Sequence, residues 1–446
     1  MQTKQSKQDR RRFLKHTGSI VTAGALTGAA VPMVHAAEDN TINIGLVGCG
    51  GRGLGALQQA LNADSGIKIY ALGDAFQDRA ANAAKHLMKD AKIANRADIG
   101  DRIFGELDSY KKVIDTLNPG DAVILASPPA FRPLHFEYAV KRGLHIFAEK
   151  PLAVDTPGCK KILAANETAK QKNLKVAVGL MMRHHHRTEE AVKAVQDGII
   201  GDIVSCYVYR MHNEFFPPHR NDYTPLQSQL IGFQGFPWGN GGFETDWMIH
   251  SVDVACWARG EMLPVSVEGQ GGRQVRTVND QLFDHAAYEY RFDDGVKMVV
   301  RLRHQSKTFY YSGDWVYGTK GAARIGEGIM SPKIYKGYKE IPENVIWQPK
   351  SNDNNHYQEE HHLFFKAIRS NTTWNEIKRS VDATMTCIMA RMAVDSGLEI
   401  TTQAAWDSTY EMAPGLENWT LSSQAPVLPG QDGRYPLAKP GTTREF

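Results

Sequence analysis

The chain is 446 residues long, which is enough for two or three domains. Its 42% hydrophobic and 23% charged residues are ordinary for a soluble globular protein and exclude a low-complexity class. The formal net charge of +3 comes from the basic first 36 residues, and the remainder is slightly acidic, so nothing indicates a nucleic-acid partner. The five cysteines are scattered without a CxxC pair, so we expect no disulfide framework.

Residues 1–36 have the features of a cleaved twin-arginine signal peptide. Arg10-Arg11-Arg12-Phe13-Leu14-Lys15 is followed by a mildly apolar run, 18–34, and by the small-residue cleavage site Val34-His35-Ala36. The run is diluted by Gly, Ala and Thr and falls short of the ~20 strongly apolar residues that a membrane-spanning helix needs. We therefore expect a periplasmic or otherwise exported protein with no stable membrane span.

A glycine-rich turn follows directly on an apolar strand predicted over 42–47. Gly48-Cys49-Gly50-Gly51-Arg52-Gly53 has the form GxGxxG, which brings bare backbone and the N-terminus of the next helix against a pyrophosphate. Asp74 ends a second strand, 67–72, about 20 residues later, where a carboxylate is expected to bind ribose hydroxyls. Asp74 favours NAD as the cofactor. Arg79, one turn into the next helix, could bind a 2′-phosphate, so NADP is an alternative. The predicted dinucleotide site comprises Gly48, Gly50, Gly51, Arg52, Gly53 and Asp74.

Residues 41–182 alternate strand and helix patterns, which predicts a parallel sheet covered on both faces. The buried strand 122–126 ends in Ser127-Pro128-Pro129. Because ligands bind at the carboxyl ends of such strands, we expect Ser127 and Pro128 to border the nicotinamide half of the cofactor. The remaining predicted strands are 145–148 and 174–180, and the helices are 54–63, 77–89, 109–117, 131–142 and 156–172.

The pattern changes over 183–413 to mainly antiparallel strands, and residues 414–446 form a Pro/Gly-rich tail. The aromatic, Pro- and Gly-rich stretch 212–242 is expected to be irregular. Asp293-Asp294-Gly295 predicts a hairpin turn. The predicted strands are 203–211, 265–271, 285–292, 296–303 and 315–325, and the main helices are 188–197, 359–369 and 380–397.

Asp246, His250, Asp253 and Trp257 follow one another at i, i+4, i+7 and i+11, so they line one face of a predicted helix. Asp246 and His250 could begin a metal site, but no third ligand stands at a convincing separation, so we predict no metal. A capped helix with a partly buried polar face is the alternative from the pattern alone.

With these motifs the chain resembles the glucose–fructose oxidoreductase, inositol dehydrogenase and MocA superfamily (Gfo/Idh/MocA) over nearly all of its mature length. The resemblance implies an α/β fold: a Rossmann doubly wound parallel sheet, then a second α+β domain with a large open-faced, mainly antiparallel sheet. It also implies a homodimer or homotetramer. The matching pieces are Gly48–Gly53, Asp74, Ser127-Pro128-Pro129, Glu149-Lys150-Pro151 and the Asp246–Trp257 helix.

Carried over position by position, the resemblance places Lys150 beside both the nicotinamide and the substrate hydroxyl. His250 would share the proton transfer as acid or base, and Asp246 would orient the substrate or His250. Asp253 would support the helix, and Glu149 and Lys150 would join the cofactor-binding residues.

Three further residues are candidates for contact with a substrate. Arg183 and His184 follow the last predicted strand of the parallel sheet and resemble an Arg-His pair found in part of the superfamily. The alternative for both is a position on the protein surface. Trp238 belongs to the aromatic stretch 212–242, whose rings either pack within the loop or form a platform for sugar rings.

The favoured function is an NAD(P)-dependent oxidoreductase that acts on a carbohydrate or cyclitol hydroxyl. Because free nicotinamide is scarce outside the cytoplasm, the cofactor should stay tightly held and be reset within each cycle. An alternative within the superfamily is an NAD-dependent, redox-neutral glycoside hydrolase that oxidises, eliminates, hydrates and reduces. A third hypothesis is a non-catalytic protein that only retains a nucleotide. The presence of both Lys150 and His250 argues against it.

Overall fold

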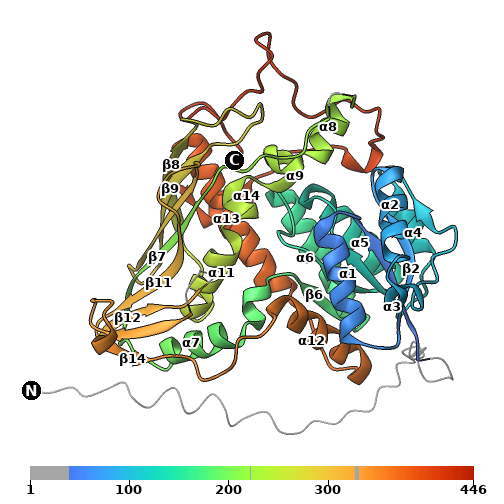
Figure 1. Cartoon of the computed structure of the whole chain (residues 1–446). Helices are drawn as coiled ribbons and strands as arrows, with labels where there is room; N and C mark the ends of the chain where they lie inside the picture. The colour runs from blue at the N-terminus through green and yellow to red at the C-terminus, as the bar shows by residue number, and fades with distance from the viewer. Residues whose placement is uncertain (1–39, 221, 327–330) are drawn as a thin grey trace, which may run out of the picture.

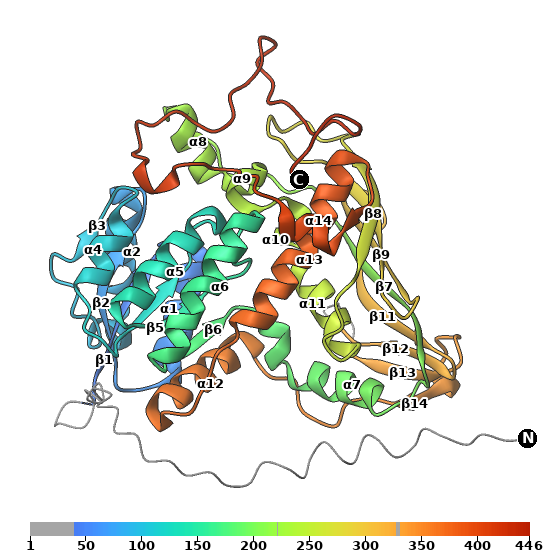
Figure 2. The same cartoon turned by 180° about the vertical axis from the view of Figure 1, so that it is seen from behind.

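The computed structural model describes residues 40–220, 222–326 and 331–446, so the signal peptide predicted for residues 1–36 lies outside the described part. Two sheets stand on opposite sides of a central group of helices (Figures 1 and 2). None of the helices in the described ranges combines the length and hydrophobicity needed to cross a bilayer.

The first sheet is parallel throughout and has the strand order β3-β2-β1-β4-β5-β6. Its strands are nearly continuous apolar runs because helices cover both faces. The strands are β1 (Ile42–Val47), β2 (Ile67–Gly73), β3 (Ile103–Phe104), β4 (Ala122–Leu125), β5 (His145–Ala148) and β6 (Val176–Val178). The helices are α1 (Gly51–Ala63), α2 (Gln77–Leu87), α3 (Ala91–Ala94), α4 (Ser109–Asp115), α5 (Arg132–Arg142) and α6 (Thr156–Gln171).

The strand order reverses between β1 and β4, and this point positions the site. The glycine loop follows β1 and Ser127 follows β4, so both loops open at the same edge of the sheet. Ligands of open α/β sheets bind in the crevice that such a reversal creates.

The second sheet has nine strands in the order β14-β13-β12-β11-β7-β10-β9-β8-β15, and only β7 and β10 pair in parallel. Helices α11 (Ile249–Ala258) and α13 (Ile377–Ser396) cover one face. The strands are β7 (Ile203–His212), β8 (Ser266–Gly272), β9 (His285–Arg291), β10 (Lys297–His304), β11 (Tyr311–Gly318), β12 (Gly321–Arg324), β13 (Lys333–Lys336), β14 (Val345–Trp347) and β15 (Ile400–Thr401). The remaining helices are α7 (His186–Gln196), α8 (Pro225–Ile231), α9 (Pro237–Asn240), α10 (Phe243–Asp246), α12 (His356–Ser370) and α14 (Thr402–Asp407).

The predicted α/β fold class is confirmed, and three local predictions are corrected. The stretch 212–242 contains helices, because Thr224 and Gln227 form a reciprocal capping box that starts α8. The predicted strand 315–325 is the hairpin of β11 and β12. The predicted helix 246–257 is interrupted at Trp247 and Met248, so Asp246 ends α10 and His250 lies in α11.

The C-terminal tail crosses from the second sheet to the Rossmann domain along α9 and α8 (Figures 1 and 2). Its apolar side chains join one cluster with residues of α8, α9 and the loops after β2 and β4. The tail therefore fastens the 212–242 segment against both halves of the molecule. Cluster members include Phe76, Phe131, Leu226, Leu230, Phe236, Trp238, Trp419 and Ala425.

Candidate active site

The glycine loop presents an open, uncapped helix end at the edge of the parallel sheet. Gly50 is the N-cap residue of α1 and offers the helix no side-chain cap, and a Cβ added at Gly50 or Gly51 would meet no atom within 4 Å. A Cβ at Gly53 would stand 2.0 Å from the Gly48 carbonyl oxygen, so only glycine allows α1 to lie this close to the turn. Exposed N–H groups above an uncapped helix end are suited to a pyrophosphate, which fits a bound dinucleotide.

Asp74 braces this loop from the end of β2. Its Oδ2 accepts a hydrogen bond from the N–H of Cys49 at 2.8 Å, and its Oδ1 accepts one from the N–H of Phe76 at 3.1 Å. Burial raises the pKa of the Asp74 carboxyl. The predicted ribose ligand therefore also holds the glycine loop to the sheet.

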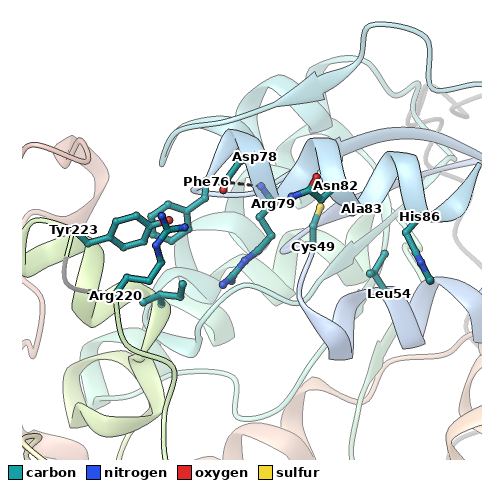
Figure 3. A pocket seen from close by; sticks show the side chains of 11 residues that line it. Cys49, Leu54, Phe76, Asp78, Arg79, Asn82, Ala83, His86, Arg220 and Tyr223 are labelled. Atoms are coloured by element: carbon teal, nitrogen blue, oxygen red, sulfur yellow. Dashed lines mark hydrogen bonds between the residues drawn. The ribbon is translucent and has the colours of Figure 1, made fainter.

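Side chains from both halves of the chain meet over this end of the Rossmann domain (Figure 3). The rings of Phe76 and Tyr223 stack with centroids 5.1 Å apart. Arg79 lies over Phe76 and Arg220 over Tyr223, with guanidinium carbons 5.6 and 4.4 Å from the ring centroids. Arg79 is the residue that makes NADP an alternative to NAD in the sequence analysis. It lines a cavity of about 340 Å³ together with Asp78.

A second cavity, also of about 340 Å³, lies between the glycine-loop edge and the second domain. Lys150 reaches across it, and its Nζ donates to the backbone oxygen of Asp246 and to Asp246 Oδ1 at 3.0 Å. His250 lies in the same wall. We call this cavity the cleft; its lining residues are Arg52, Ala126, Ser127, Pro129, Arg132, Glu149, Lys150, Gly179, Met181, Arg210, Phe233, Gln234, Asp246, Trp247, His250 and Tyr357.

His250 is buried, and its surroundings favour the neutral imidazole. Burial lowers its pKa well below the ordinary value, and the positive charges of Lys150 and Arg210 lower it further. Its Nδ1 has no hydrogen-bond partner among the described residues. A neutral imidazole on the cleft wall can accept a proton.

Glu149 connects the glycine loop to the cleft. Its Oε1 lies 2.9 Å from Nε of Arg52, so the ion pair ties the start of α1 to the segment after β5 that carries Lys150. Ser127 lines the cleft and its hydroxyl hydrogen-bonds His135 Nδ1 at 3.0 Å. Pro129, rather than Pro128, is the proline that lines the cavity.

Three predicted substrate residues lie outside the cleft lining. Arg183 is buried and its guanidinium pairs with both oxygens of Asp253, each at 2.7 Å, so this pair fastens α11 to the Rossmann domain. His184 lies 3.3 Å from the Glu376 carboxylate. Trp238 is 2% exposed, and its Nε1 donates to Gln229 within the apolar cluster under the tail. Each is buried and held by partners in the protein interior, so the structure places all three away from the residues that line the cleft.

Two arginine side chains that line the cleft, Arg132 and Arg210, are not predicted from the sequence. Arg132, in the first turn of α5, donates to the backbone oxygens of Pro151 and Ser127. Arg210 lies on β7, where the inward-facing positions Cys206 and Val208 precede it. A charged residue at an inward position of a strand is a signal that could have singled out Arg210.

Within the described ranges, no three His, Cys, Asp or Glu side chains gather in a way that could hold a metal ion. All five cysteines are buried free thiols.

Comparison with known proteins gives matches on both halves. Residues 42–180 match the GFO_IDH_MocA model, described as the oxidoreductase family with an NAD-binding Rossmann fold, and residues 188–324 match the GFO/IDH/MocA C-terminal domain. The inositol 2-dehydrogenase of Azotobacter vinelandii is 31% identical over 221 residues, which cover 49% of this chain and 54% of that protein. Inositol 2-dehydrogenase 2 of Saccharopolyspora erythraea is 29% identical over 70% of this chain and 81% of that protein.

Solved structures share the fold at lower identity. The scyllo-inositol dehydrogenase of Lactobacillus casei, with bound NAD(H) and scyllo-inositol, has a TM-score of 0.60 and 20% identity, over 81% of this chain and 99% of that one. The aldose–aldose oxidoreductase of Caulobacter crescentus has a TM-score of 0.62 and 15% identity, with the same coverage. The chain therefore belongs to the Gfo/Idh/MocA family of oxidoreductases and carries an NAD-binding Rossmann domain followed by the C-terminal domain of that family.

Proposed function

We propose that the protein is an exported dehydrogenase that oxidises a secondary hydroxyl of a cyclitol or a sugar with a tightly held NAD. The observation that carries the proposal is the meeting of Lys150, Asp246 and His250 on one cavity whose other wall is the glycine-loop edge. The names of the sequence relatives, inositol 2-dehydrogenases, support a cyclitol as substrate.

The residues that would hold NAD are those at the glycine-loop edge. The N–H groups of Gly50 and Gly51 would bind the pyrophosphate, and Asp74, which braces their loop, would bind the adenosine ribose. Ser127 would border the nicotinamide. When bound, the nicotinamide supplies the hydride acceptor.

The chain's own residues handle the proton. The neutral His250 ring would accept the proton of the substrate hydroxyl as its O–H bond breaks. The Lys150 ammonium, held by Asp246, would hydrogen-bond the same oxygen and stabilise the charge that develops on it. Arg210, on the adjoining wall, would position another hydroxyl of the ring.

The experiment uses the purified full chain, its bound nucleotide, and myo-inositol, scyllo-inositol, free sugars and aryl glycosides as substrates. We expect reduction of NAD by a cyclitol or sugar, abolished in Lys150→Ala with the nucleotide still bound. Lys161→Ala, an exposed lysine of α6, is the control and should keep full activity. Unchanged turnover in Lys150→Ala would refute the assignment. Release of an aglycone without net NADH would favour the redox-neutral glycosidase instead.

Export through the twin-arginine route and assembly into a homodimer or homotetramer are part of the proposal. The face of the second sheet opposite α11 and α13 carries a group of half-buried tyrosines, Tyr207, Tyr209, Tyr311 and Tyr317, whose rings contact one another. Such a face is suited to pairing with a second copy. Light scattering of the purified protein tests the assembly, and replacing Arg10 and Arg11, the twin arginines, by lysine tests the export route.

A further inference from the structure

The last residues of the chain return to the interior of the second domain. Glu445 is 5% exposed, and its carboxylate pairs with Nη2 of Arg391 at 2.7 Å. Ser408 Oγ donates to the backbone oxygen of Glu445, and the Gly441 N–H donates to the Ser396 oxygen at the end of α13 at 2.7 Å. Figures 1 and 2 show the C-terminus beside α13 and α14. A carboxylate from the chain end is thus built into the core next to a buried guanidinium.

Arg391 lies near several acidic side chains, Glu445, Asp395 and Glu244. Burial raises the pKa of Glu244, and burial together with the charges of Glu445 and Glu244 raises the pKa of Asp395. It is Glu445 that hydrogen-bonds the guanidinium. Removing this partner would leave Arg391 free to turn toward the other carboxylates, because a buried charge requires compensation.

The other side of the guanidinium holds the turn that leads into the cleft. Arg391 Nη1 donates to the backbone oxygen of Gly241 at 2.8 Å. Gly241 and Gly242 have φ of +87° and +85°, where glycine alone is comfortable, and Asn240 Oδ1 accepts the Gly242 N–H at 2.8 Å. Asp246 then donates its N–H to the Gly242 oxygen at 2.9 Å. The position of this turn therefore sets the position of Asp246.

We propose that Glu445 and Arg391 are positioning residues for the Lys150–Asp246 pair. By fixing Arg391, the chain end fixes the 240–242 turn, from which Asp246 reaches Lys150. Glu445 and Arg391 are not part of the cleft lining, so they act through the turn. The inference rests on the proposed function, because it concerns the same pair.

The test compares Glu445→Gln with Glu445→Asp, which keeps the charge, in the full chain. Glu417→Gln, an exposed carboxylate of the same tail, is the matched control. We expect Glu445→Gln to lower kcat on the order of 10-fold to 100-fold with the KM for NAD unchanged, as a small misplacement of reacting groups does. Glu445→Asp should retain more of the activity, and Glu417→Gln all of it.

A second readout needs no turnover: the rate at which acetic anhydride acetylates Lys150, measured by peptide mass spectrometry. Glu445→Gln should change this rate, since Lys150 would lose its fixed partner, and Glu417→Gln should leave it unchanged. Wild-type kcat together with a wild-type acetylation rate in Glu445→Gln would overturn the inference. A loss of kcat that only follows a loss of folded protein, with Lys150 acetylated at the wild-type rate, would overturn it as well.

The two readouts separate this inference from the proposed function. If the wild-type chain oxidises no cyclitol or sugar, the proposed function fails, and the Lys150 acetylation rates still decide whether Glu445 positions the pair. If Glu445→Gln does not fold, Arg391→Lys takes its place, because lysine lacks the fork that reaches both Glu445 and the Gly241 oxygen, and an unchanged Lys150 rate in that variant counts against the inference.

Discussion

The Nζ atom of Lys150 lies 3.0 Å from Oδ1 of Asp246, a residue 96 positions further along the chain. The lysine follows β5 of the Rossmann domain, whereas the carboxylate ends α10 of the second domain. The contact therefore joins the two halves of the molecule at the cleft. Both partners are largely withdrawn from solvent, with side chains 19% and 11% exposed, which strengthens the interaction between their charges.

Replacing Asp246 by Asn tests this contact. The variant keeps the shape of the side chain and removes the charge that orients the ammonium, so we expect kcat to fall by about 100-fold with NAD still bound. Steady-state kinetics with the substrate identified for the wild type measure the effect. Asp108→Asn is the control, because Asp108 forms an exposed ion pair with Lys112 at 2.8 Å and should be neutral. Equal activity in Asp246→Asn and the wild type would show that the charge is not needed.

The glycine loop gives a second prediction, for Gly53→Ala. The added Cβ would stand 2.0 Å from the Gly48 oxygen, so α1 must move away from the turn that would hold the pyrophosphate. We expect the Kd for NAD to rise on the order of 100-fold, about 2.7 kcal/mol. Calorimetric titration of the nucleotide-free protein measures this.

Gly55→Ala is the matched control for that experiment. Its Cβ would meet only the Arg52 side chain, at 3.6 Å, and it also lies in α1. Because alanine favours a helix over glycine, the variant should bind NAD normally and gain about 0.5–1 kcal/mol of stability. An equal loss of NAD affinity in both variants would mean that the close approach of Gly53 to Gly48 is not what matters.

The Arg183–Asp253 pair is expected to matter for stability. Arg183→Met leaves Asp253 charged and buried, since both side chains are at most 3% exposed. Breaking a buried pair in this way costs about 3–5 kcal/mol, to be measured by urea unfolding. Lys193→Met breaks an exposed i, i+4 pair with Asp197 and should cost at most about 0.5 kcal/mol. A change of similar size in the two variants would contradict this account.

His135 predicts a defined pH dependence of stability. Burial, with the nearby charge of Arg132, lowers its pKa to about 3. The His135 ring takes up a proton near pH 6.5 in the unfolded chain but not in the folded chain. This residue therefore makes the free energy of unfolding decrease as the pH is lowered below about 6.5. Its contribution is complete above that value and decreases by about 1.4 kcal/mol per pH unit below it.

His135→Asn removes this dependence. The difference in unfolding free energy between wild type and variant, measured in urea at several pH values from 7 to 5, should shrink by roughly that amount per pH unit below 6.5. The exposed His362→Asn serves as the control for replacing a histidine elsewhere in the chain. A difference between the wild type and His135→Asn that stays constant with pH would show that the ring takes up a proton as readily in the folded protein as in the unfolded chain.

The local motifs were readable because each depends on a few neighbouring residues. The GxGxxG turn between an apolar strand and a helix requires glycines wherever it occurs, so the Rossmann domain and its cofactor followed from 42–74 alone. The sequence predicts an irregular stretch over 212–242, because the helices there are short and are stabilised by the tail that packs on them. That packing joins residues separated by about two hundred positions and leaves no periodic signal.

The amino-acid sequence by itself determined the fold class, the NAD-binding edge, and the residue types available for proton transfer, since these depend on local periodicity and spacing. Only the tertiary structure decided which of the candidates meet. In the folded chain Lys150 contacts Asp246. Arg183, His184 and Trp238 are buried in the interior, whereas Arg132 and Arg210 line the cleft. The physical reason is that a buried charged or polar side chain needs a hydrogen-bond or ion-pair partner. These partners come from distant segments of the chain, so they are known only from the folded structure.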